Sequence, residues 1–217
     1  MDIVEKYDLF IFDCDGTLVD SMPMWEDITY TFADYKGIYA PEGLNEIMNN
    51  MSLYQCAEYY VNILGAKGTP EQVSKELSDF AAEEYRLRLP QKPNAKQFLS
   101  YLRERGKHVA LATASDISTL KPCFERLGMY EFIEYFASCD TVGKSKEHPD
   151  VFLDCAEHFG LSADRCVVIE DAPYAAETAG KAGFSVIGVY EKCNSQKKLD
   201  FLARLSEVFI RDFSELM

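Results

Sequence analysis

The chain has 217 residues, of which 47% are hydrophobic and 27% charged, and its formal net charge at pH 7 is −14. These proportions are typical of a globular protein that is long enough to bury a sizeable core in one domain or two. The negative charge argues against binding to a nucleic acid polymer, which requires clustered Lys and Arg, but it is compatible with a small anionic substrate that meets one local cationic group.

The start of the chain, Met1 to Glu5, lacks the basic residues of a secretory signal, and the apolar run from Leu9 to Phe12 is too short to cross a membrane. The seven cysteines are odd in number and form no CxxC pair, which is typical of reduced thiols. We therefore expect a cytoplasmic protein that does not contact a membrane.

The first predicted strand covers residues 7–12 and is apolar throughout, as expected of a strand buried on both faces. Asp13, Asp15, Gly16 and Thr17 follow directly. Side chains two residues apart in an extended chain point to the same side, so both carboxylates leave the strand together and need a cation or a proton to offset their desolvation. The same pattern also fits a solvated turn, whereas the remaining ligands of an EF-hand calcium loop are absent.

Residues 21–89 contain no convincing strand and four helical patterns. Trp25 begins an apolar stripe with 3-4-3 spacing, and a second stripe begins at Leu44. Ser52 and Thr69 each stand three residues before a Gln and predict capping boxes. We expect a helical domain inserted after the first strand, at the carboxyl end where α/β sheets bind ligands. It fits a mobile lid over a site, and also a subdomain with only a packing role.

Short apolar runs at residues 109–112, 166–169, 185–189 and 208–210 alternate with helical patterns. One predicted helix begins at Asn94 as its N-cap. The alternation predicts an α/β fold with a Rossmann-like parallel sheet and helices on both faces. We expect residues 1–20 and 90–217 to form this core domain and residues 21–89 to form the helical domain.

Three further polar groups follow predicted strands or precede a helix. Glu170 and Asp171 form a second acidic pair, and oxygen ligands without His or Cys suit Mg²⁺, although the pair also fits a helix cap. Thr113, Ala114 and Ser115 offer hydroxyls and backbone N–H groups for a phosphate, and equally a helix N-cap. Lys146 precedes a predicted helix and fits either a charge-offsetting group or an ordinary surface lysine.

Together these segments resemble the four motifs of the haloacid dehalogenase superfamily. The matching residues are Phe10 to Leu18 (FIFDCDGTL), Ala112 to Ser115 (ATAS), Lys146 three residues before Pro149, and Val168 to Asp171 (VIED). The resemblance spans nearly the whole chain, and the helical insert looks like the cap of the phosphoglycolate phosphatase and β-phosphoglucomutase subgroup. The four motifs are specific for fold and chemistry and carry little information on the substrate.

The resemblance implies a phosphatase that hydrolyses a small phosphorylated metabolite through an aspartyl-phosphate. Asp13 would be the nucleophile and Asp15 the general acid and base. Mg²⁺ would be held by Asp13, the backbone carbonyl of Asp15 and Asp171, with Glu170 in or near its shell. Thr113 and the N–H of Ala114 would hold phosphate oxygens, and Lys146 would offset their charge.

Two other functions are compatible with the same fold. A β-phosphoglucomutase-like sugar phosphomutase would be expected to carry a cap Arg and a hinge His, but residues 49–53 (NNMSL) contain no Arg and residues 21–23 (SMP) contain no His. A non-catalytic regulator that binds metal or phosphate on the same fold would be expected to have lost Asp13 or Asp15, and both are present. The sequence carries no signal for the oligomeric state.

Overall fold

The computed structural model describes residues 3–48 and 51–217, so Met1, Asp2, Asn49 and Asn50 lie outside it. The chain divides into two compact units. The first runs up to Asp20 and resumes at Leu89, and the second is Ser21–Arg88. Leu89, which the sequence analysis assigned to the helical domain, therefore groups with the first unit.

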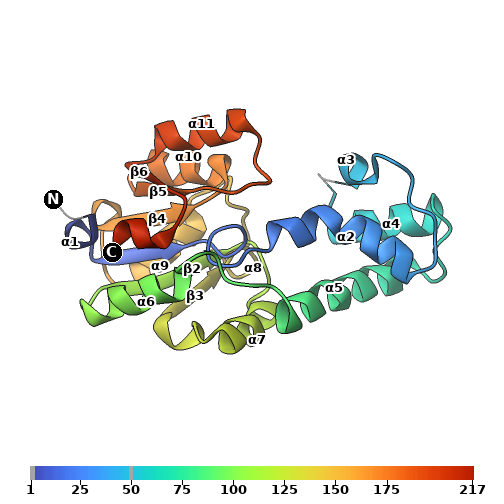
Figure 1. The fold of residues 1–217 in the computed structure, drawn as a ribbon, viewed down its shortest axis with the longest axis horizontal. Coiled ribbons are helices and arrows are strands. Elements are labelled where there is room, and N and C mark those ends of the chain that lie inside the picture. Colours follow the sequence, from blue (N-terminus) through green and yellow to red (C-terminus); the bar gives the residue numbers. More distant parts are fainter. Residues whose placement is uncertain (1–2, 49–50) are drawn as a thin grey trace. The chain divides into compact units, whose positions relative to one another are not determined.

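The first unit is built on a parallel sheet of six strands, as the sequence predicts (Figure 1). The strands are β1 (Leu9–Phe12), β2 (His108–Thr113), β3 (Tyr135–Ser138), β4 (Cys166–Glu170), β5 (Ser185–Val189) and β6 (Val208–Ile210). Their order across the sheet is β3-β2-β1-β4-β5-β6, which places β1 between β2 and β4. The carboxyl ends of these three neighbours thus meet at one edge, and all three carry the polar motifs.

Alternation along β1 explains why both faces of the sheet are covered. Leu9 and Ile11 lie in an apolar cluster with residues of the helices that follow β3, β4 and β5. Phe10 and Phe12 point to the opposite face, where both contact the ring of Phe98 with centroids 6.1 Å apart. Side chains of a strand alternate between faces, so a strand that is apolar at every position requires helices on both sides.

The remaining elements of the first unit precede, connect or follow these strands. They are α1 (Ile3–Lys6), α6 (Ala95–Glu104), α7 (Ile117–Leu127), α8 (Cys139–Val142), α9 (Asp150–His158), α10 (Pro173–Lys181) and α11 (Gln196–Leu205), with short 3₁₀ turns η1 (Tyr130–Phe132), η2 (Ala163–Arg165) and η3 (Phe213–Leu216). Gly128 ends α7 in the left-handed conformation, with a φ of +64° that favours glycine.

The second unit contains α2 (Met22–Tyr35), α3 (Leu44–Met48), α4 (Leu53–Asn62) and α5 (Pro70–Leu87). The side chains of Ser52 and Thr69 accept hydrogen bonds from the N–H groups of Gln55 and Gln72, whose side chains bond back, so both predicted capping boxes are confirmed. Buried apolar side chains of all four helices share one core, in which the ring of Phe32 packs against its neighbours. The predicted helical character is therefore confirmed for the described residues of Ser21–Arg88.

The structure departs from the sequence analysis at two elements. Strand β3 was not predicted: its apolar residues are only three, Tyr135 to Ala137, between Glu134 and Ser138, and it lies at the edge of the sheet with two of its four residues half-buried. Asn94 occupies the position before α6, but it adopts the left-handed conformation and makes no side-chain cap. Its amide instead donates to Asp212 at 2.7 Å.

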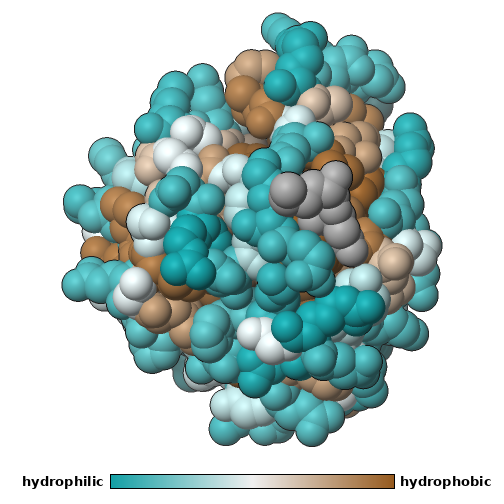
Figure 2. All heavy atoms as spheres, turned by 90° about the vertical axis from the view of Figure 1, so that its left-hand side faces the viewer, coloured by the Kyte–Doolittle hydropathy of each residue, from teal (hydrophilic) through white to brown (hydrophobic). Residues whose placement is uncertain are grey.

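The surface of the molecule is strongly polar on the face that Figure 2 shows, where hydrophilic residues cover most of the area. Within residues 3–48 and 51–217, every helix is too short or too polar to span a bilayer.

Candidate active site

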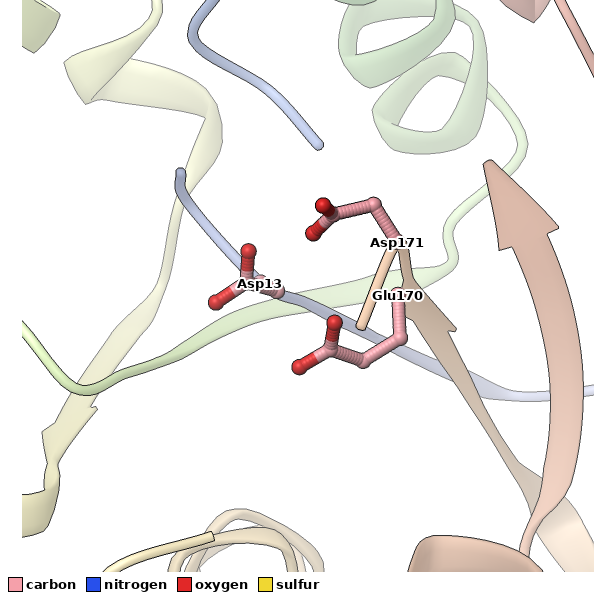
Figure 3. A group of neighbouring side chains, drawn as sticks. All are labelled: Asp13, Glu170 and Asp171. Atoms are coloured by element: carbon pink, nitrogen blue, oxygen red, sulfur yellow. The ribbon is translucent and has the colours of Figure 1, made fainter. Parts of the chain in front are cut away.

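The candidate site lies at the carboxyl edge of the sheet, where β1 and β4 end side by side. Phe12 is paired with Ile169 in the parallel register, and the N–H of Asp13 donates to the carbonyl of Ile169 at 2.9 Å. Asp13 therefore leaves β1 directly beside Glu170 and Asp171, which leave β4 (Figure 3). The two acidic motifs, far apart in the sequence, are brought together by the pairing of two strands.

Three carboxylates form a compact, buried cluster. Asp13, Glu170 and Asp171 each offer an oxygen, and these oxygens all lie within 4.8 Å of one another. The residues are 6%, 1% and 5% exposed. Such burial of several carboxylates is costly unless cations compensate their charge.

Lys146 supplies part of that compensation from the segment that precedes α9. Its ammonium bonds to Oδ1 of Asp13 and, at 2.7 Å, to Oε1 of Glu170, and the residue is only 3% exposed. The burial and these two bonds exclude the alternative of an ordinary surface lysine. The other oxygen of Glu170 accepts from the N–H of Ala172 at 2.8 Å, so both oxygens of this carboxylate are engaged by the protein.

The pKa values reflect this environment. Burial raises the pKa of Asp13 to about 7; the charges of Glu170 and Asp15 add to the rise, and Lys146 opposes it. Burial, followed by the charges of Glu170 and Asp13, raises the pKa of Asp171 well above its ordinary value. Burial alone would lower the pKa of Lys146, but Asp13 and Glu170 outweigh it and raise the net value, so this ammonium stays charged.

The donor set fits a hard divalent cation. The cluster contains only carboxylate oxygens, and together with Asp15 it holds four acidic groups against one ammonium. A divalent ion would offset most of the remaining negative charge and favour the ionised forms of Asp13 and Asp171. Oxygen ligands without nitrogen or sulfur suit hard cations such as Mg²⁺, Ca²⁺ or Mn²⁺ better than Zn²⁺ or Cu²⁺.

Asp15 is held near the cluster by the turn that follows β1. The N–H of Gly16 donates to Val19 at 2.9 Å, and Gly16 has a φ of +85°, a conformation that glycine adopts without strain. Oδ2 of Asp15 accepts a hydrogen bond from Oγ of Ser115 at 2.7 Å. This bond links the first motif to the end of β2.

The segment after β2 carries the predicted phosphate-binding residues. Thr113 is fully buried, and its Oγ1 accepts from the N–H of Ser115 at 2.9 Å. Ala114 is exposed. The structure thus brings all the candidate residues to one sheet edge, on segments that follow β1, β2 and β4 and precede α9.

Two contacts with carboxylates of the site were not predicted from the sequence. Ser115 was expected to offer its hydroxyl or N–H to a phosphate or to act as a helix N-cap, and its place one residue after Ala114 is the only signal for its bond to Asp15. The hydroxyl of Thr17, a residue of the first motif, donates a hydrogen bond to Oδ1 of Asp171 at 3.3 Å. Both residues hold carboxylates of the site rather than adding charge to it.

The helical unit contains a cavity of about 200 Å³. Among the described residues, its lining includes Trp25 and Tyr60 and no charged side chain. Trp25 donates to Tyr85 at 3.0 Å, and Tyr60, which is fully buried, donates to the carbonyl of Thr29 at 2.6 Å. These contacts give both aromatic residues a packing role within this unit.

The model of one protein family matches most of the chain. Residues 7–183 match the family described as "Hydrolase: haloacid dehalogenase-like hydrolase". This range includes both acidic motifs, the ATAS segment and Lys146.

Curated relatives and solved structures resemble the chain over most of its length. Hexitol phosphatase A of Escherichia coli is 29% identical over 189 residues, which are 83% of this chain and 82% of that protein. Fructose-1-phosphate phosphatase YqaB of the same organism is 24% identical over 185 residues, 85% and 97% of the two chains. A crystal structure from Thermotoga maritima, provisionally named a β-phosphoglucomutase, has a TM-score of 0.82, 22% identity and 96% coverage of both chains. It supports the fold.

Proposed function

The chain belongs to the haloacid dehalogenase-like hydrolases, and we propose that it is a Mg²⁺-dependent phosphatase that hydrolyses a small phosphorylated metabolite through an aspartyl-phosphate on Asp13. The observation that carries this proposal is the buried cluster of Asp13, Glu170 and Asp171 with Lys146. A carboxylate nucleophile and a phosphate dianion repel each other, so a site that joins them needs cations. This site provides one ammonium and a set of oxygen ligands for a metal.

In the first step an oxygen of Asp13 attacks phosphorus, and the bond between phosphorus and the ester oxygen breaks. The departing alkoxide takes a proton from the carboxylic acid of Asp15, which becomes a carboxylate. Ser115 supports this role because its hydroxyl bonds to Asp15 and restricts the orientation of the carboxyl group.

In the second step the carboxylate of Asp15 takes a proton from water, and the water oxygen attacks phosphorus. The bond between phosphorus and Asp13 then breaks, which releases inorganic phosphate and restores both aspartates to their initial states. Lys146, which bonds to Oδ1 of Asp13, offsets charge as it develops on the oxygens of the phosphoryl group.

Asp13, the carbonyl of Asp15 and Asp171 would hold Mg²⁺. Its chemistry is to neutralise the phosphate oxygens and reduce their repulsion of the nucleophile. Glu170 would stand beside the ion and hold Lys146, since its two oxygens are already bonded to Lys146 and Ala172. Thr113 and the N–H of Ala114 would bind phosphate oxygens.

The substrate class is a phosphorylated sugar or sugar alcohol. The support comes from curated relatives that are named hexitol and fructose-1-phosphate phosphatases and that match 83% and 85% of this chain. The helical unit would act as a cap that orders the leaving group and excludes bulk water. A phosphatase is favoured over a mutase because residues 49–53 contain no Arg, although Asn49 and Asn50 lie outside the described residues.

The test is release of inorganic phosphate from a panel of hexose and hexitol phosphates with Mg²⁺ and with a chelator. We expect turnover only when metal is present. Asp13→Asn should abolish turnover, and the melting temperature of this variant should stay near that of the parent. Asp34→Asn, an exposed aspartate of α2, is the matched control and should retain activity. Full activity of Asp13→Asn would refute the mechanism, and conversion of a hexose 1-phosphate to the 6-phosphate without net phosphate release would identify a mutase.

A further inference from the structure

The turn after β5 holds the backbone of a proposed metal ligand. The side-chain amide of Asn194 donates to the carbonyl oxygen of Asp171 at 3.0 Å. In its side chain, Oδ1 of Asp171 accepts a hydrogen bond from the hydroxyl of Thr17 at 3.3 Å. β4 and β5 pair in parallel with Glu170 opposite Gly188, which brings this turn next to the end of β4. Asp171 is thus held both at its backbone and at its carboxylate.

A buried ion pair holds the turn itself. Glu191 is 1% exposed and accepts at Oε2 from the ammonium of Lys92 at 2.8 Å. Its other oxygen accepts from the N–H of Cys193 at 3.0 Å, and its carbonyl accepts from the N–H of Asn194 at 3.1 Å. The position of Asn194 therefore depends on Glu191, and that of Glu191 depends on Lys92.

Lys92 lies on the segment through which the chain re-enters the α/β unit, four residues after Arg88. Its N–H donates to the carbonyl of Leu18 at 2.9 Å, and its ammonium also reaches the carbonyl of Tyr190 at 3.2 Å. This segment is therefore fixed to the chain that follows β1 and to the turn after β5.

We propose that Asn194 is a positioning residue for metal binding, which fixes the peptide of Asp171 and is held in place by the ion pair of Lys92 and Glu191. The inference rests on the metal site proposed above. A carboxylate binds a cation tightly only when its approach is set in advance, and partners that orient a metal ligand typically change metal affinity by about 10- to 100-fold. None of these three residues belongs to the four motifs, and none contributes an atom to the carboxylate cluster.

The experiment is calorimetric titration of Mg²⁺ into metal-free protein, for the parent and for Asn194→Ala, Lys92→Met and the double variant. We expect Asn194→Ala to weaken the affinity about 10-fold or more. Lys92→Met should weaken it as well, and the double variant should be no weaker than the more affected single one, because both substitutions break the same network. Should Lys92→Met fail to fold, Glu191→Gln breaks the ion pair and keeps an acceptor for Cys193.

The matched control is Gln196→Ala, two residues further along the chain. Its amide also donates a single hydrogen bond, at 2.7 Å, but to Asp200 rather than to Asp171, so its loss should leave Mg²⁺ affinity unchanged. If the parent binds Mg²⁺ and Asn194→Ala binds it with the same affinity, the role of Asn194 is refuted while the proposed metal site stands. A parent that binds no Mg²⁺ overturns the proposed metal site with it, and additive effects in the double variant overturn the role of Lys92.

Discussion

Replacing Ser115 by alanine tests whether the hydrogen bond to Asp15 orients the proposed general acid. The hydroxyl of Ser115 donates to Oδ2 of Asp15 at 2.7 Å, across the ends of two neighbouring strands. The N–H of Ser115 is bonded to Oγ1 of Thr113 at 2.9 Å, so alanine keeps the backbone in place and removes only the hydroxyl. The substitution therefore changes one contact of Asp15 and leaves the cluster around Asp13 intact.

The size of the effect follows from the character of this bond. A hydrogen bond to an ionised carboxylate contributes about 1.5–3 kcal/mol. If that contribution is lost mainly in the transition state, where Asp15 must align with the leaving oxygen, kcat should fall about 10- to 100-fold. KM should change little, because Ser115 in this role acts on Asp15 rather than on the bound substrate.

The assay is steady-state phosphate release with saturating Mg²⁺, with the melting temperature measured in parallel. Ser118→Ala is the matched control, because its hydroxyl also donates to a carboxylate at 2.7 Å, that of Asp116 at the exposed start of α7. Ser115→Thr should recover much of the lost kcat by restoring a hydroxyl. A rise in KM at constant kcat for Ser115→Ala would refute the reasoning and make Ser115 a phosphate ligand instead.

Two further predictions concern stability. Gly188→Ala should lower the free energy of unfolding by about 1–3 kcal/mol, because the added Cβ would lie 2.4 Å from Oγ of Ser206. Gly180→Ala should raise the free energy of unfolding by about 1 kcal/mol, because alanine is the better helix former and its methyl group in α10 meets nothing within 4 Å. Urea unfolding of both variants measures these changes, and two changes of the same sign would contradict the packing argument. Burial would raise the pKa of Glu191, but the hydrogen bonds from Lys92 and Cys193 outweigh the effect of burial and lower the pKa. The ionised carboxylate of Glu191 therefore stabilises the fold above about pH 4.3, and this stabilisation is lost as the pH falls further. Glu191→Gln should therefore cost about 3 kcal/mol at pH 7 and progressively less as the pH falls below about 4.3. A cost that does not change with pH in urea unfolding would contradict this.

The sequence predicted those parts of the site that follow from buried strands. An apolar run that ends in acidic residues places carboxylates at the carboxyl edge of a parallel sheet, and this placed Asp13 and Asp171 on the same edge. The confirmed capping boxes at Ser52 and Thr69 also depend only on residues close to each other in the chain. In each case a pattern within a few residues determines the structure.

Features that depend on distant partners were not predicted. Strand β3, with only three apolar residues, is recognised through its parallel pairing with β2. The burial of Lys146 depends on Asp13 and Glu170, which are 133 and 24 residues away in the chain. Asn194 has no motif around it, and its contact with Asp171 exists only because β4 and β5 are neighbours.

The charge arrangement around Asp13 is the reason why the proposed mechanism needs a metal in addition to Lys146. Lys146 bonds to Oδ1 of Asp13 and to Glu170, so its single charge is shared between two carboxylates before any substrate binds. Asp15 and Asp171 add two further acidic groups, and a phosphate dianion adds two more negative charges. One buried lysine cannot offset this total in a site of low dielectric constant. In the proposed mechanism, Lys146 holds the side chain of Asp13 in one orientation, and the proposed divalent cation would carry most of the neutralisation.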